Sequence, residues 1–173
     1  IVQDEGSQLV AVADSVDENA KNLAKLYKVN PRSVDAIFED NSIEAILIAS
    51  STDTHSDFIE KASKAGKAIL CEKPVDLSLA RAKRCLENTK SNEHSIMMGF
   101  NRRFDPNFVA LKNALDKGEI GTAEMLSITS FDPAPPPIDY VKVSGGIFKD
   151  MMIHDFDMAN FLYGELPKSV FVS

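Results

Sequence analysis

The chain has 173 residues, of which 44% are hydrophobic, and its formal net charge at pH 7 is −7. This composition is typical of a soluble globular protein, and the scattered Lys and Arg residues argue against nucleic acid or an anionic membrane as the main partner. No apolar run approaches the roughly 18 residues of a membrane span, and Cys71 and Cys85 lack the spacing of a metal site or a disulfide framework. We expect a cytoplasmic protein that binds small molecules or proteins.

Strand and helix signals alternate over residues 9–100. Short apolar runs predict four strands, at 9–14, 44–50, 68–71 and 95–100. Between them, apolar residues at helical spacing and capping residues predict helices within 17–29, 51–67 and 78–92. This alternation indicates an α/β fold with a partial, Rossmann-like, doubly wound parallel sheet and right-handed crossovers.

The pattern changes after residue 100. A helix is predicted from Pro106, a long strand over 123–131, and a final strand over 168–173. Residues 132–146 contain four prolines and two glycines, which predict a loop, and a further helix follows at Asp150. We expect the beginning of an α+β substrate and oligomerisation domain, so that the chain divides into residues 1–100 and 101–173.

Polar side chains follow the predicted strands at their carboxyl ends, where ligands bind in open parallel sheets. Asp14 stands where a carboxylate can accept hydrogen bonds from both ribose hydroxyls of an adenosine and repel a 2′-phosphate, although capping of the next helix is an equally good interpretation. His55 can contact a ligand or cap its helix, and capping is favoured. The predicted cofactor-binding residues are Asp14, Ser50, Thr52, His55, Glu72 and Lys73.

Lys73 lies between Glu72 and Pro74, directly after a predicted buried strand. Pro74 restricts Lys73 to an extended conformation, so the ammonium is presented from a stiff turn. There it can hydrogen-bond a substrate hydroxyl and stabilise the oxyanion that forms as the proton leaves. The alternative is a solvated lysine paired with Glu72, and the tripeptide alone favours this alternative.

Asp150, His154 and Asp157 interrupt an apolar helical segment. In one continuous helix, His154 lies about 40° and Asp157 about 340° around the axis from Asp150, so the three groups share one stripe. An acid one turn from a histidine can fix its tautomer and stabilise its protonated form, which suits a general base. A buried hydrogen bond that only holds the fold has equal weight. Asp157 either contacts the site residues without touching the substrate, or pairs with a nearby Arg.

A metal site ranks lower than a general base. Asp150 and His154 stand at i and i+4, but no third His or Cys occurs at a familiar spacing. We therefore predict no metal.

Three segments together resemble the Gfo/Idh/MocA oxidoreductase family, and most closely its inositol 2-dehydrogenase branch. They are AILCEKP at 68–74, GFNRRFDPNF at 99–108 and GGIFKDMMIHDFDMANFLYG at 145–164. The resemblance covers almost the whole chain. It implies a nicotinamide-binding Rossmann domain, NAD as cofactor, and an α/β domain through which the complete protein forms homo-oligomers.

By this resemblance, Lys73, Asp150 and His154 are catalytic. Hydride would pass to NAD from a ring carbon of a cyclic polyol, myo-inositol or a close isomer, while His154 removes the hydroxyl proton. Asp150 would orient His154, and Lys73 would hold the same oxygen. The predicted substrate-binding residues are Lys73, Arg102, Asp132, Tyr140, Asp150 and His154, and ion pairing or surface exposure is an equally good interpretation of Arg102, Arg103, Asp132 and Tyr140.

The sequence departs from the family pattern at both ends. The G-x-G-x-x-G turn that seats the pyrophosphate should precede Leu9 and is absent from these residues, and the second domain stops before most of its sheet. We expect a fragment that alone binds NAD poorly or not at all and is inactive. A sugar-sensing regulator without catalysis, or a related sugar or dihydrodiol dehydrogenase, is the alternative function; the combination of Lys73, Asp150 and His154 argues against the regulator.

Overall fold

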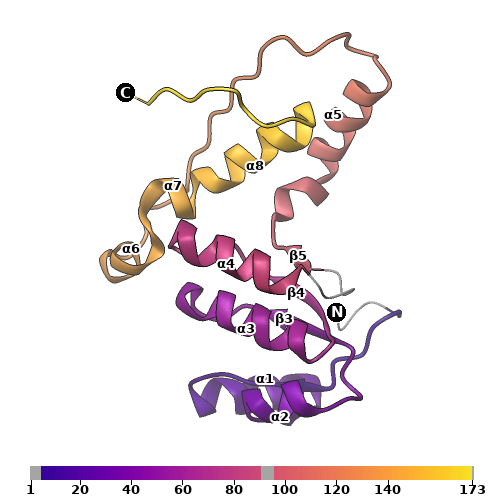
Figure 1. Ribbon diagram of the computed structural model, residues 1–173, viewed down its shortest axis with the longest axis vertical. Coiled ribbons are helices and arrows are strands. Elements are labelled where there is room, and N and C mark those ends of the chain that lie inside the picture. The colour runs from indigo at the N-terminus through magenta and orange to yellow at the C-terminus, as the bar shows by residue number, and fades with distance from the viewer. Residues whose placement is uncertain (1–4, 91–95, 173) are drawn as a thin grey trace. The chain divides into compact units, whose positions relative to one another are not determined.

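The computed structural model describes residues 5–90 and 96–172. The chain folds as two compact units, Ile1–Met97 and Met98–Ser173. The first unit alternates strands and helices (Figure 1). In order these are β1 (Ala11–Val12), α1 (Asp17–Tyr27), β2 (Asn30–Pro31), α2 (Val34–Glu39), β3 (Ala45–Ile48), α3 (Thr52–Lys64), β4 (Ala68–Cys71), α4 (Leu79–Thr89) and β5 (Ile96–Met98).

All strand pairs that the structure defines by register are parallel, which confirms the predicted α/β class. β1 pairs with β2, with Ala11 opposite Asn30, and β3 pairs with β4, with Ala45 opposite Ala68. The strands form two sheets in the described part of the chain, β1-β2 and β3-β4-β5. The four predicted strands and three predicted helices of this unit are present; residues 91–95, which we assigned to the end of one helix and the start of a strand, lie outside the described residues.

Two short elements of the first unit were not predicted. β2 has only two residues, and one of them, Pro31, has no N–H to donate to a neighbouring strand. α2 has six residues, and Ser33 caps it by accepting a hydrogen bond from the backbone N–H of Ala36. Elements of this length carry too little hydrophobic periodicity to be recognised.

The core of the first unit lies between helix α3 and the strands β3 and β4. α3 packs against β3, β4 and α4, and Figure 1 shows α3 and α4 side by side. Ile48, Ile59, Ala62, Ile69 and Cys85 are buried there. Burial of this apolar surface fixes α3, and with it the turns that follow β3 and β4, as one rigid block.

The second unit is built of helices in its described residues. They are the 3₁₀ helix η1 (Asn101–Phe104) and the α-helices α5 (Pro106–Asp116), α6 (Ile138–Ser144), α7 (Gly146–Asp150) and α8 (Met152–Tyr163). The strands predicted over 123–131 and 168–173 are wrong for the residues that the structure describes. A strand needs a neighbour to satisfy its backbone groups, and no strand within 99–172 offers one. Met125 and Phe131 are accordingly 89% exposed.

Two further predictions for this unit need correction. Helix α6 lies inside the predicted proline-rich loop, because the prolines end at Pro137, where a proline is compatible with the start of a helix. The helix that we drew through Asp150, His154 and Asp157 is broken. Asp150 ends α7 and α8 begins at Met152, so the three side chains do not follow one continuous helical stripe.

Candidate active-site residues

The turn after β4 carries Lys73. The backbone N–H of Glu72 still bonds to the carbonyl of Ile48 at 2.9 Å, so the strand ladder continues to the first residue of the turn. The Lys73–Pro74 peptide bond is cis. Pro74 is buried, Lys73 is half-buried and Glu72 is exposed. Lys73 therefore lies between an exposed glutamate and a buried proline, directly after β4.

His55 lies in the first turns of α3 and is only 1% exposed. Its Nδ1 is 2.8 Å from the carbonyl oxygen of Pro74, and its Nε2 is 3.0 Å from that of Ser50. Both ring nitrogens are thus engaged by backbone. The ring therefore does not cap α3, which was the favoured interpretation, and contact of His55 with the cofactor stays a prediction.

The remaining cofactor-binding candidates lie near the carboxyl ends of β1 and β3. Asp14 is exposed, and its Oδ1 accepts a hydrogen bond of 2.8 Å from the N–H of Val16, which orders the turn before α1. The Ser50 and Thr54 hydroxyls are 2.6 Å apart. Thr52 begins α3 and is half-buried. At these strand ends the carboxylate can accept hydrogen bonds from a polar ligand, and the hydroxyl groups can both accept and donate them.

Within the second unit, Asp150 and Tyr140 are hydrogen-bonded. The Tyr140 hydroxyl donates to Oδ1 of Asp150 over 2.8 Å. This bond, with a contribution from burial, raises the pKa of Tyr140, because the carboxylate stabilises the protonated phenol. We predicted that both residues bind the substrate, and we did not predict that they contact each other.

His154 occupies the first turn of α8 and is half-buried, with its Nδ1 shielded from solvent. Its ring packs edge-on against Phe100, with centroids 6.4 Å apart and planes at 89°. Phe100 immediately precedes η1. The Phe100 ring therefore packs against one side of the imidazole.

Two arginines of η1 pair with two aspartates of α8. Arg102 bonds to Asp155 at 2.5 Å, and Ser130 donates to the same carboxylate oxygen at 2.7 Å. Arg103 donates from Nε and Nη2 to the two oxygens of Asp157, at 2.7 and 2.5 Å. Hydrogen bonding to Asp157 raises the pKa of Arg103.

These pairs answer one question that the sequence left open. Asp157 pairs with an arginine, as one of our two interpretations held. We did not predict a role for Asp155 or Ser130. The available signal was spacing: Arg102 and Arg103 are adjacent, and Asp155 and Asp157 lie two apart on a partly buried helix, where carboxylates need partners. Asp132 is exposed in an irregular segment.

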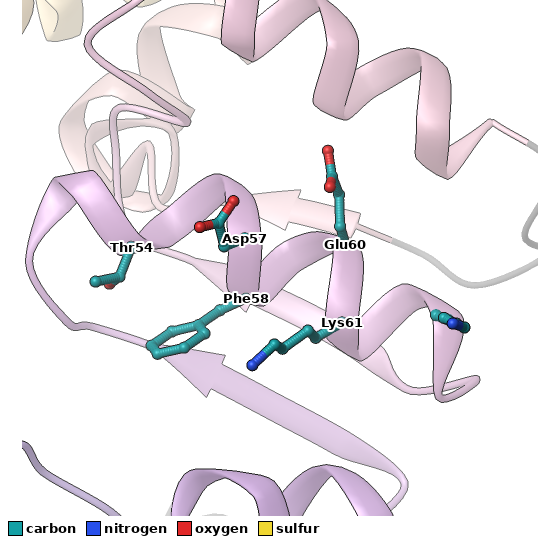
Figure 2. Close-up of a pocket in the computed structure, with 6 residues that line it drawn as sticks. Thr54, Asp57, Phe58, Glu60 and Lys61 are labelled. Atoms are coloured by element: carbon teal, nitrogen blue, oxygen red, sulfur yellow. The ribbon is translucent and has the colours of Figure 1, made fainter.

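A hollow of about 400 Å³ lies along the exposed side of α3 (Figure 2). All six lining residues come from this helix, and they are Thr54, Asp57, Phe58, Glu60, Lys61 and Lys64. In Figure 2 Asp57 and Glu60 point toward α4, where Arg81 bonds to them at 2.6 and 2.5 Å. None of the predicted site residues lines this hollow, so we do not treat it as the site.

No group of three or more His, Cys, Asp and Glu side chains within 5–90 and 96–172 is placed to hold a metal ion. Across the same ranges, no helix has the length and apolar character needed to cross a membrane.

Comparison with known proteins identifies relatives along the whole chain. Residues 1–100 match the model of an oxidoreductase family with an NAD-binding Rossmann fold, and residues 108–173 match the Gfo/Idh/MocA C-terminal domain. The chain is 52% identical over 164 residues to inositol 2-dehydrogenase of Rhizobium meliloti; this alignment covers 95% of the chain and 50% of the relative. It is 46% identical over 165 residues to myo-inositol 2-dehydrogenase of Thermotoga maritima, and this second alignment covers 94% of the chain and 49% of that relative.

A solved structure is also similar. The crystal structure of a myo-inositol dehydrogenase from Corynebacterium glutamicum superposes with a TM-score of 0.89 at 43% identity, covering 94% of this chain and 49% of that one. The chain spans about half the length of the curated relatives it matches.

Proposed function

Because the chain belongs to the Gfo/Idh/MocA oxidoreductase family, we propose that the complete protein oxidises one hydroxyl of a cyclic polyol, myo-inositol or a close isomer, to the ketone with NAD. Relatives named inositol 2-dehydrogenase and myo-inositol 2-dehydrogenase, at 52% and 46% identity, support this substrate class. The observation that carries the proposal is made within each unit: Lys73 follows β4 and precedes the buried Pro74, and Asp150 and His154 lie where α7 ends and α8 begins.

Three residues of the chain have separate roles in removing the proton of the reacting hydroxyl. His154 accepts the proton of the reacting hydroxyl, and its ring packs against Phe100. Asp150 stabilises the imidazolium that forms. Lys73 donates a hydrogen bond to the same substrate oxygen as its negative charge develops. The chemistry that bound NAD supplies is acceptance of the hydride from the carbinol carbon.

NAD, rather than NADP, is proposed from the charges around Asp14. Asp14 is exposed near the end of β1, and Asp17 and Glu18 occupy the first turn of the next helix. No Lys or Arg occurs between residues 9 and 20. These carboxylates can accept from ribose hydroxyls and would repel a 2′-phosphate. Ser50, Thr52, Glu72 and Lys73 are proposed to contact the rest of the cofactor.

The remaining predictions about the complete protein stay proposals. We propose a boundary between the nucleotide-binding and substrate-binding domains at residue 100; the two compact units of the chain meet at Met97 and Met98. We propose that Arg102, Asp132 and Tyr140 contribute to the polyol site, and that the complete protein forms a homo-oligomer in the cytoplasm.

A panel of substrates tests this function. The complete protein is mixed with NAD or NADP and with myo-inositol, scyllo-inositol, glucose or a dihydrodiol, and NADH or NADPH formation is followed by absorbance. We expect the highest kcat/KM for an inositol with NAD. Faster turnover of the sugar or the dihydrodiol would select the related dehydrogenases. Binding of dinucleotide without turnover of any of these compounds would select the regulator.

A further inference from the structure

The buried ring of His55 connects two turns of the first unit. Its Nδ1 lies 2.8 Å from the carbonyl oxygen of Pro74, in the turn after β4, and its Nε2 lies 3.0 Å from that of Ser50, in the turn after β3. His55 itself is in α3, which packs against both strands. One rigid five-membered ring therefore sets the spacing between the two turns.

The chemistry of the two contacts is unusual. A carbonyl oxygen can only accept a hydrogen bond, and a neutral imidazole has one donor nitrogen and one acceptor nitrogen. Which nitrogen donates depends on the tautomer, and donation from Nδ1 to the nearer carbonyl, that of Pro74 at 2.8 Å, is sufficient to hold the turn after β4. At 1% exposure, water does not compete for either nitrogen.

On the Pro74 side, the bridge holds the residue that follows Lys73. Proline has no N–H, so the carbonyl is the only backbone group through which Pro74 can be hydrogen-bonded. Ser56, which follows His55 in α3, holds the same turn: its hydroxyl donates to Oδ2 of Asp76 at 2.7 Å, and Asp76 is two residues after Pro74. Two consecutive side chains of α3 therefore fasten residues 74–76.

We propose that His55 is a positioning residue for the reaction: by holding the Pro74 carbonyl, it fixes the backbone that presents Lys73 to the reacting oxygen. This inference rests on the proposed function, in which Lys73 donates to that oxygen. It assigns to His55 neither contact with substrate nor contact with cofactor. Its effect on the rate passes entirely through Lys73.

A double-variant cycle in the complete protein tests this dependence. His55→Gln retains a polar side chain but cannot bridge both carbonyls with two separate nitrogens. We expect kcat to fall about 100-fold, as for a small displacement of a catalytic group. In the Lys73→Met background, His55→Gln is expected to cause no further loss. If the two losses multiply, or if His55→Gln alone leaves kcat unchanged, the inference is wrong.

Thr89→Val is the matched control. The Thr89 hydroxyl is also buried and also donates to a backbone carbonyl, that of Cys85 at 2.9 Å, but it lies at the end of α4 away from both turns. This variant is expected to lower the melting temperature and leave kcat unchanged. An equal fall of kcat in Thr89→Val would show that any loss of buried polar contact is enough, and would contradict a specific role for His55.

Two measurements do not depend on turnover. In His55→Gln, hydrogen exchange at the amides of Val75 and Asp76 should accelerate about tenfold, while the amides of α1 keep their rates. In the wild-type protein, ¹⁵N chemical shifts of His55 should report a proton on Nδ1, the nitrogen nearer to Pro74. An Nδ1 without a proton, or unchanged exchange at these amides, would refute the bridge. If both results hold but the wild-type oxidises no polyol, the proposed function fails and the bridge stands.

Discussion

The hydroxyl of Tyr140 donates a hydrogen bond of 2.8 Å to the carboxylate of Asp150. The contact joins α6, which lies inside a proline-rich segment, to the last residue of α7. In the proposed function Asp150 stabilises the protonated His154, so Tyr140 is placed to hold that carboxylate in position.

Replacing Tyr140 with Phe should reduce turnover. A hydrogen bond to a charged group contributes about 1.5–3 kcal/mol, so we expect kcat to fall about tenfold with little change in KM for NAD. Tyr163→Phe, which alters a tyrosine at the exposed end of α8, is the control and should be silent. Equal kinetics in Tyr140→Phe and the wild type would show that Asp150 does not need this donor.

The same contact predicts a pH dependence. Because the bond to Asp150 raises the pKa of Tyr140, its stabilising effect is fully present below the ordinary tyrosine pKa and is lost as pH rises through the raised value. Spectrophotometric titration of the wild type minus Tyr140→Phe should place Tyr140 above the other tyrosines, and Asp150→Asn should bring it back down. A Tyr140 that titrates at its ordinary value in the presence of Asp150 would contradict the assignment.

Loss of Arg103 should destabilise the second unit. Asp157 has a side chain only 9% exposed and receives two hydrogen bonds from Arg103, whose guanidinium also lies over the rings of Phe100 and Phe161. Arg103→Met leaves that carboxylate without these donors, and we expect a loss of about 2 kcal/mol in the free energy of unfolding. Asp116→Asn, which breaks the exposed pair with Lys112, should cost less than about 0.5 kcal/mol. Urea denaturation compares the two, and similar losses would argue against the special weight of Arg103.

Lys67 should matter for stability alone. It is 2% exposed, and its ammonium donates to the carbonyls of Asp40 and Ile43 at 2.7 and 2.8 Å, which closes the loop between α2 and β3. Lys67→Met keeps the apolar stem but leaves both acceptors without this donor, at a cost of about 2 kcal/mol. Lys64→Met, on an exposed position of α3, serves as the reference. A Lys67→Met protein that melts like Lys64→Met would show that other groups satisfy these carbonyls.

Asp14 should control cofactor choice. Asp14→Ser removes the negative charge near the end of β1, and we expect KM for NADP to fall by about tenfold while KM for NAD rises. Steady-state kinetics of the complete protein with each cofactor provide the comparison. Unchanged preference would indicate that Asp14 acts only in the turn with Val16.

Local signals in the first unit were enough to predict most of its fold. Gly66 and the turn at Lys73 flank the apolar run 68–71, and β4 spans the same four residues, Ala68–Cys71. Hydrophobic periodicity could not reveal the break between α7 and α8, because Met151 has helical dihedral angles. Only the pattern of backbone hydrogen bonds changes at Met151. The strands assigned to 123–131 and 168–173 failed because their patterns require neighbouring strands, which the sequence of one segment cannot specify.

The candidate site was predictable by residue type and not by contact. Lys73, Asp150 and His154 were recognisable because polar and charged side chains next to apolar runs are costly to bury unless they have a partner. The bridge from His55 to Pro74 and Ser50 depends on tertiary packing of α3, and His55 and Pro74 are 19 positions apart in the sequence. The pairing of Arg103 with Asp157 spans 54 residues for the same reason.

The most direct test of the account is NADH formation from myo-inositol by the complete protein and by two single variants, Lys73→Met and His154→Ala, with melting curves recorded in parallel. We predict turnover by the wild type, and a fall in kcat of at least about 100-fold in each variant with the melting temperature retained, because both lose proton or oxyanion chemistry. Variants that turn over at the wild-type rate and differ only in melting temperature would contradict the catalytic assignment.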